Sequence, residues 1–256
     1  AAFTATADKA TREDIVTQLS DKNFKTIVKG FDRPNLSLNV AEKSDIKNAL
    51  ASILMSKKGQ SGIIYCLSRN EVDTTALFLK EKGFNAIAYH AGKSAQDRKQ
   101  AQNRFMTERA TIMVATIAFG MGVDKPDIRF VIHASLPGSI EAFYQEIGRA
   151  GRDGQPSETI MFYGLQDLIK RQRMIFEGQK KGDFQFLEYK RLETLLGYCE
   201  TASCRRKALL SHFDENIDEC GNCDNCLEKP LVVDYTREAK LVIQTIKLTG
   251  QFFGAA

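Results

Sequence analysis

The 256-residue sequence predicts an α/β fold: a parallel β-sheet flanked by helices, followed by a small helical region with four closely spaced cysteines. Between residues 44 and 163, apolar runs of strand length alternate with amphipathic stretches of helical length. The runs are continuously apolar, which is typical of strands that a parallel sheet buries on both faces. After Tyr163 the strand-like runs stop, and helical stretches lead into the cysteines.

The elements can be assigned in order along the chain. Residues 1–8 resemble a short strand, a helix follows at about 9–20, and Pro34 marks a linker at Phe31–Asn35 because proline restricts its neighbour. The sequence then predicts helices at 44–57, 70–82 and 95–106, and strands at 62–66, 84–89, 110–115, 129–133 and 158–163. Further helices are predicted from Ile140 onward, at 165–177, at 184–199, from Cys204 to about Phe213, and at 236–247.

The composition describes an ordinary globular protein, with 43% hydrophobic and 27% charged residues. The sequence has no apolar run of membrane-spanning length and no signal-peptide pattern, so we expect an intracellular protein without a membrane partner. A net charge of +4 permits a nucleic-acid partner without indicating one. Four of the six cysteines lie within residues 204–226, which favours a metal site over a disulfide framework.

A basic, glycine-rich segment stands out at Gln145–Gly154. Gln145, Arg149 and Arg152 have the spacing of one helix face, and the apolar residues of 140–147 would anchor that helix on the core.

The same segment holds Gly148, Gly151 and Gly154, although each glycine costs a helix about 1 kcal/mol relative to alanine. Their clustering indicates a close approach to another backbone or to a phosphate. Arginine offers a rigid fork of donors and stays charged, so this glycine-rich helix end suits a polyphosphate.

Polar residues follow three of the predicted strands, at the edge where α/β sheets bind ligands. They are Ser68 and Arg69 after 62–66, His90 and Gly92 after 84–89, and Thr116 after 110–115. Short hydroxyls, glycine N–H groups and a few basic side chains suit the sugar-phosphate backbone of one nucleic-acid strand. Each of these residues taken singly could equally be a satisfied loop residue, and His90 could simply cap its strand.

The cysteine-rich region has the spacing C-x₁₅-C-x₂-C-x₂-C from Cys204 through Cys220 and Cys223 to Cys226. Four thiolates suit a closed, structural Zn²⁺ site, and an iron–sulfur cluster is the alternative. Cys199 competes with Cys204 as the fourth ligand. Cys66 is interpreted as a core thiol and His212 as an ordinary helix-end residue.

The segment Q-E-I-G-R-A-G-R-D-G at 145–154 resembles motif VI of the RecQ branch of superfamily 2 helicases, whereas the DEAD-box branch typically has His-Arg in place of Gln145-Glu146. The resemblance implies a second RecA-like motor lobe. It assigns Gln145, Arg149 and Arg152 to a catalytic nucleotide cleft, with Arg152 as the arginine finger.

Other segments extend the resemblance over nearly the whole chain. Residues 2–7 resemble motif III, with Phe3 in place of the usual Leu, and imply that Thr4 and Thr6 couple ATP state to DNA. The residues after the strands resemble motif IV, the Y-H-A-G element and motif V. They imply that Ser68, Arg69, His90, Gly92 and Thr116 face DNA and that Asp124 points to the nucleotide ribose. A cysteine opening C-R-R favours Cys204 over Cys199, which then becomes a core thiol.

The resemblance also implies a domain plan. It comprises the end of a first RecA-like lobe (1–30), a linker (31–35), the second lobe (36–165), a RecQ-type zinc-binding domain (166–229) and the start of a winged helix (230–256). An amphipathic tail packed on the zinc-binding domain is the alternative for the last segment. A phosphate-binding Walker A loop is missing, because the decoy Gly92-Lys93-Ser94 lacks its first glycine, and no DEAH-type box is present. We therefore expect the chain to begin inside a larger protein.

The functional expectation is the C-terminal half of a RecQ-like, ATP-dependent 3′–5′ DNA helicase that acts on single-stranded and junction DNA. ATP and Mg²⁺ would be held mainly by the missing first lobe, Zn²⁺ would be structural, and the fragment alone would not hydrolyse ATP. The alternative is a non-catalytic, zinc-containing DNA-binding or partner module.

Overall fold

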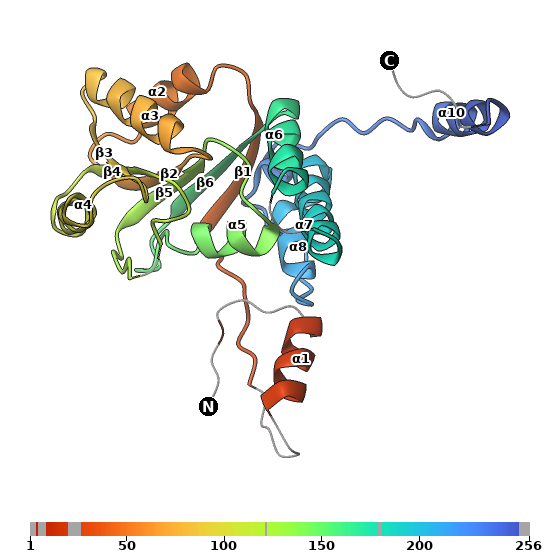
Figure 1. The fold of residues 1–256 in the computed structure, drawn as a ribbon, viewed down its shortest axis with the longest axis horizontal. Coiled ribbons are helices and arrows are strands. Elements are labelled where there is room, and N and C mark those ends of the chain that lie inside the picture. The colour runs from red at the N-terminus through yellow and green to blue at the C-terminus, as the bar shows by residue number, and fades with distance from the viewer. Residues whose placement is uncertain (1–3, 5–8, 20–26, 121, 179–180, 251–256) are drawn as a thin grey trace.

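The computed structural model describes residues 4, 9–19, 27–120, 122–178 and 181–250. Their centre is a six-stranded sheet in the order β1-β6-β5-β2-β4-β3, in which every pairing is parallel (Figure 1). The strands are β1 (Leu36–Glu42), β2 (Ser61–Tyr65), β3 (Asn85–Tyr89), β4 (Thr111–Ala115), β5 (Ile128–His133) and β6 (Ser157–Tyr163). The predicted parallel sheet flanked by helices is confirmed.

Helices cover both faces of the sheet (Figure 1). On one face α2 and α3 bury residues such as Leu50 and Val72 against Ile64 and Phe130. On the other face α4 and α5 pack, and α7 and α8 extend that layer beside α5. The helices are α1 (Lys9–Leu19), α2 (Ile46–Met55), α3 (Arg69–Glu81), α4 (Ala95–Thr107), α5 (Ile140–Ile147), α6 (Leu165–Phe176), α7 (Asp183–Glu200), α8 (Arg205–Ser211), α9 (Asp224–Leu227) and α10 (Thr236–Leu248).

Strand β1 was not predicted from the sequence. Its residues alternate, with Leu36 and Leu38 buried and their neighbours partly exposed, so it lacks the continuous apolar run of the central strands. The alternation follows from its place at the edge of the sheet, where β1 pairs with β6 alone among the strands. The segment predicted as a linker therefore ends where this strand begins.

The basic segment is not helical throughout, which corrects one expectation. Helix α5 ends at Ile147 with Gly148 as its C-cap, and Arg149 and Arg152 lie in the turns that follow. Gly151 has a φ of +57°, and a Cβ there would lie 2.4 Å from Asn35 Nδ2. The close approach that the glycines indicated is thus, at Gly151, an approach to another part of the chain.

The C-terminal region packs on the outer edge of β1. An isolated parallel bridge joins Leu38 to Cys223, and Val40 N donates to Asp224 Oδ2 at 2.9 Å. Helix α10 lies apart from this body, joined by an extended segment, and residues 228–250 are exposed (Figure 1). The alternative of a tail packed on the cysteine-rich region is therefore wrong. None of the described helices is long and apolar enough to cross a bilayer.

Substitution of Gly62 in β2 tests the packing of the sheet directly. A Cβ at this position would lie 2.1 Å from the ring of Phe130, a fully buried side chain on the neighbouring strand. Because the ring is enclosed by the core, Gly62→Ala should lower the free energy of unfolding by about 3 kcal/mol, as overpacked cores do. Denaturant unfolding measures this. Gly138→Ala, where a Cβ meets nothing within 4 Å, is the matched control, and equal stability of the two variants would contradict the prediction.

Candidate nucleotide and nucleic-acid sites and a cysteine cluster

The residues predicted to face nucleic acid do gather at one edge of the sheet, because all strands are parallel and these residues follow β2, β3 and β4. Ser68 is the N-cap of α3, and its hydroxyl accepts from Glu71 N at 3.2 Å. Arg69 is exposed, and its Cδ lies 3.2 Å from the position of a Cβ on Gly92. Thr116 is partly exposed, at the end of β4. Arg69 at the start of α3, Gly92 and Thr116 thus come from three separate segments to one edge.

His90 has a different position from the one expected of a DNA contact. Its side chain is 7% exposed, and its Nε2 lies 3.0 Å from Asp73 Oδ2. Its Nδ1 accepts from the backbone N–H of Gly92 at 3.1 Å, so Nε2 carries the proton that Asp73 accepts. Both ring nitrogens are therefore engaged within the lobe, and His90 shapes the turn at Gly92.

The two arginines of the basic segment meet the loop between β4 and β5. Arg149 donates to the backbone oxygen of Gly120. Arg152 donates to Val123 O at 3.0 Å and pairs with Asp124 Oδ1 at 2.7 Å. The residues predicted to bind nucleotide, Asp124, Arg149 and Arg152, therefore lie together on one side of the lobe. Gln145 is exposed on α5, one turn before Arg149.

A buried polar cluster lies behind Arg149, and the sequence did not indicate it. His133 Nε2 lies 2.6 Å from Glu146 Oε2, with side-chain exposures of 1% and 9%. The His133 ring stacks on Tyr65 at 5.3 Å between centroids, and Tyr65 Oη donates to Phe119 O. Burial raises the pKa of Tyr65, and this effect outweighs the lowering by nearby Arg149. The cluster connects the carboxyl ends of β2 and β5 to the turn that carries Arg149.

The coupling residues are only partly described. Thr4 is exposed, and Thr6 lies outside the described residues.

The four predicted metal ligands form one cluster. The Sγ atoms of Cys204, Cys220, Cys223 and Cys226 all lie within 4.8 Å of one another. Sγ of Cys204 is 3.9 Å from that of Cys223, and Sγ of Cys220 is 4.0 Å from that of Cys226. A tetrahedral Zn²⁺ with Zn–S bonds near 2.3 Å requires about 3.8 Å between sulfurs. The donor set and its spacing thus fit Zn²⁺.

Backbone N–H groups point at these sulfurs, as they do where thiolates carry charge. Cys204 Sγ accepts from Lys207 N and Cys220 N, and Cys223 Sγ accepts from Arg205 N at 3.3 Å. Burial alone would raise the pKa of Cys204, but the N–H donors and the neighbouring thiols lower it to about 7.

The two other cysteines lie outside the cluster. Cys199 and Cys66 are each 5% exposed, and burial raises the pKa of both thiols to about 12. Such thiols are neutral core groups. His212 ends α8 and lies 2.6 Å from Glu141 of α5, holding the pKa of that carboxyl at about 2.

The C-R-R arginines hold the cluster to the lobe, a role the sequence did not indicate. Arg205, 6% exposed, donates to the carbonyls of Tyr198 and Cys199 at 2.8 Å and pairs with Asp224. Asp224 in turn accepts from β1, so the same side chain binds both the cysteine-rich region and the sheet.

Two family matches cover most of the chain. The helicase conserved C-terminal domain matches residues 45–154, and the RecQ zinc-binding family matches residues 165–227.

Relatives and solved structures agree with these matches. The chain is 43% identical over 255 residues to the ATP-dependent DNA helicase RecQ of Haemophilus influenzae, covering 99% of this chain and 41% of that protein. It is 37% identical to the protein of the same name from Bacillus subtilis, covering 99% of this chain and 43% of that one. The chain thus spans about two fifths of these relatives.

Among solved structures, S. cerevisiae Dbp5 bound to RNA and ADP BeF3 matches with a TM-score of 0.56 at 20% identity, over 75% of this chain and 54% of that one. At that identity the match supports the RecA-like fold alone. The two family matches and the RecQ relatives lead to one assignment. The chain belongs to the RecQ family of helicases.

Proposed function

We propose that this chain is the second motor lobe and zinc-binding domain of an ATP-dependent DNA helicase, the activity that its relatives are named for. In this proposal the lobe comprises residues 36–165, the zinc-binding domain residues 166–229, and residues 230–256 begin a further domain. Since the chain spans about two fifths of those relatives, the other wall of the nucleotide cleft would come from a first lobe elsewhere in the whole protein.

One observation carries the proposal: two guanidiniums meet the β4–β5 loop on one side of the lobe. When the lobes close on ATP, Arg149 and Arg152 would reach the phosphates, with Arg152 as the arginine finger, and Asp124 would be released toward the ribose. Preorganised cations stabilise the charge that develops on the transferring phosphoryl group. Gln145, exposed one turn earlier, would complete the cleft with Mg²⁺ held by the first lobe.

The nucleic-acid side of the proposal uses the carboxyl edge of the sheet. Exposed Arg69, the N–H of the Gly92 turn and the Thr116 hydroxyl suit phosphate contacts that carry no base preference. Ser68 and His90 would act behind this surface, since Ser68 caps α3 and His90 holds the Gly92 turn. Thr4 and Thr6 would couple the ATP state to these DNA contacts. By family resemblance, the direction is 3′ to 5′ along single-stranded DNA at a duplex junction.

Zn²⁺ held by Cys204, Cys220, Cys223 and Cys226 would stabilise the fold, because four thiolates leave no open position for a reactive water.

A non-catalytic module that binds DNA or a partner protein is the second candidate. The observation that favours it is that Arg152 already has partners inside the lobe, Val123 O and Asp124, and so needs no phosphate to be satisfied.

Comparison of the whole protein with the isolated chain tests the proposal. The whole protein should hydrolyse ATP in a DNA-dependent manner and separate strands from a 3′ overhang, whereas the isolated chain should hydrolyse ATP at the no-enzyme rate. The isolated chain should still bind single-stranded DNA in a salt-dependent manner.

A whole protein that binds DNA and never hydrolyses ATP would favour the non-catalytic module. Robust ATP turnover by the isolated chain would contradict the shared cleft. A 5′ overhang preference would correct the direction alone.

A further inference from the structure

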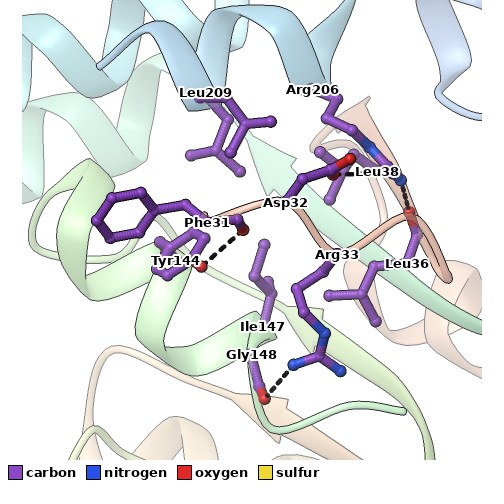
Figure 2. Close-up of a pocket in the computed structure, with 11 residues that line it drawn as sticks. Phe31, Asp32, Arg33, Leu36, Leu38, Tyr144, Ile147, Gly148, Arg206 and Leu209 are labelled. Atoms are coloured by element: carbon purple, nitrogen blue, oxygen red, sulfur yellow. Dashed lines mark hydrogen bonds and ion pairs between the residues drawn. The ribbon is translucent and has the colours of Figure 1, made fainter. Parts of the chain in front are cut away.

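The segment Phe31–Leu36 runs between the arginine turns and helix α8, and its side chains bind both (Figure 2). Arg33 is the central residue on the side of the turns. Its guanidinium donates to Ala150 O at 3.0 Å, to Gly151 O at 2.9 Å and to Gly148 O at 3.4 Å. One side chain therefore holds three backbone carbonyls that lie within four residues of each other and on either side of Arg149.

Two of these carbonyls, those of Gly148 and Ala150, lie just past the end of helix α5 at Ile147 and lack the donors that a continued helix would supply. Gly151 O accepts in addition from Gly154 N at 3.0 Å. A cation at the C-terminal end of a helix is also favoured by the helix dipole. Arg33 meets both needs, and its fork of donors suits several oxygens at once.

Asn35 reinforces the same turn. Its Nδ2 donates to Gly151 O and to Gln155 O, each at 2.9 Å. Gly151 has no room for a side chain against Asn35. The turn that carries Arg149 and Arg152 is thus bound on one side by the linker, while both guanidiniums point to the β4–β5 loop on the other.

The opposite side of the linker is bound by the cysteine-rich region. Arg206, 5% exposed, pairs with Asp32 Oδ1 at 3.2 Å and donates to Leu36 O (Figure 2). The Phe31 ring stacks on Phe213 at 4.9 Å, and from the lobe itself Tyr144 Oη of α5 donates to Phe31 O at 2.7 Å. Cys204 is the N-cap of α8, so one path from the cysteine cluster to the arginine turns runs from Arg206 to the Phe31–Leu36 segment and through that segment to Arg33.

We propose that Arg33 is a positioning residue for the arginine turns: it fixes the backbone at 148–151 so that Arg149 and Arg152 enter the nucleotide cleft in register. Arg206 anchors the linker on which Arg33 stands. The inference rests on the proposed function for its effect on turnover. The clamp itself is a property of the free protein, which allows the two to be tested apart.

The first measurement is hydrogen exchange in the nucleotide-free whole protein. The three hydrogen bonds of Arg33 involve a charged donor. Their loss should lower the free energy of local opening of the turns by about 1.5 kcal/mol, which corresponds to about tenfold faster amide exchange. Arg33→Ala should therefore speed exchange of the amides at 148–155 about tenfold and leave those of β2 and β4 unchanged. Arg104→Ala, which removes an exposed arginine paired with Glu108 on α4, is the matched control.

The second measurement is steady-state ATP hydrolysis with DNA present. Arg33→Ala should lower kcat by about 10²-fold, as expected of small displacements far from the reacting atoms, with KM for ATP changed less than threefold. Because Arg33 acts through the turns, its effect on kcat should be clearly smaller in an Arg152→Ala background, where only the positioning of Arg149 remains to be lost.

Unchanged exchange at 148–155 in Arg33→Ala would overturn the clamp, and so would a loss of kcat of equal size in both backgrounds. A wild-type protein without ATPase activity would overturn the proposed function, and the exchange measurement would still decide the clamp.

Discussion

Arg152→Ala in the whole protein should lower the turnover of ATP by about 10³-fold or more, the range found for arginine fingers, and leave ATP binding within a few-fold of wild type. The physical reason is that a finger acts on charge that develops only in the transition state, so its removal affects kcat rather than binding. Arg152 is 36% exposed and held by Asp124, which is itself 85% exposed, so its removal breaks one exposed ion pair and one hydrogen bond to Val123 O. Steady-state ATP hydrolysis measures the turnover, and equilibrium binding of a fluorescent ATP analogue measures the affinity.

Arg129→Ala provides a useful comparison, since Arg129 lies beside the same turns and pairs with Asp153 at 2.7 Å, while its contacts with the β4–β5 loop are limited to the carbonyls of Pro126 and Asp127 at the end of that loop. It should lose stability with little change in kcat. Full turnover by Arg152→Ala would remove this side chain from the finger role and leave Arg149 as the candidate.

Cys223→Ser should lose the bound zinc and unfold the region from about 165 to 229. Cys223 is fully buried, it bridges to Leu38 of β1, and its sulfur accepts from Arg205 N. Structural zinc contributes about 10–16 kcal/mol to the folding of small domains, far more than such a domain gains from its core. Metal analysis should fall from one zinc per chain toward zero, and protease should cut α6–α8 much faster than in wild type.

Cys199→Ala is the matched control, because Cys199 is also buried and lies outside the cluster. It should keep its zinc and its protease resistance. Retention of zinc by Cys223→Ser, or zinc loss by Cys199→Ala, would contradict the assigned ligands. Absorption in the visible range from the purified wild-type protein would favour the iron–sulfur alternative.

The core elements of the fold were predictable because local pattern and tertiary position agree for them. Strands β2 and β4 are buried along their whole length, and their sequences are accordingly apolar throughout. Strand β1 was not predicted because it mixes buried and partly exposed residues at the sheet edge and follows Pro34. The end of α5 was also missed: the i, i+4, i+7 spacing suggested one helix, while the glycines that end it were interpreted as a close approach to another backbone or to a phosphate.

The candidate sites divide in the same way. The cysteine cluster and the arginine turns were visible because few other roles suit those residue types at those spacings. The sequence did not reveal the roles of Arg33, Arg206 and Glu146. The two arginines bind backbone carbonyls, and Glu146 pairs with His133 on another element of the fold. An arginine that binds carbonyls looks, in a sequence, like any exposed arginine.

The outer rim of β1 has a consequence for solubility. An open strand edge offers unpaired backbone groups that recruit strands from other molecules. Here Val40 N is taken by Asp224 and Leu36 O by Arg206, both from the segment that the four thiols organise. Removal of a metal from the four thiols would therefore do more than destabilise the cysteine-rich region: it would expose the edge of β1 and make the sheet a template for aggregation.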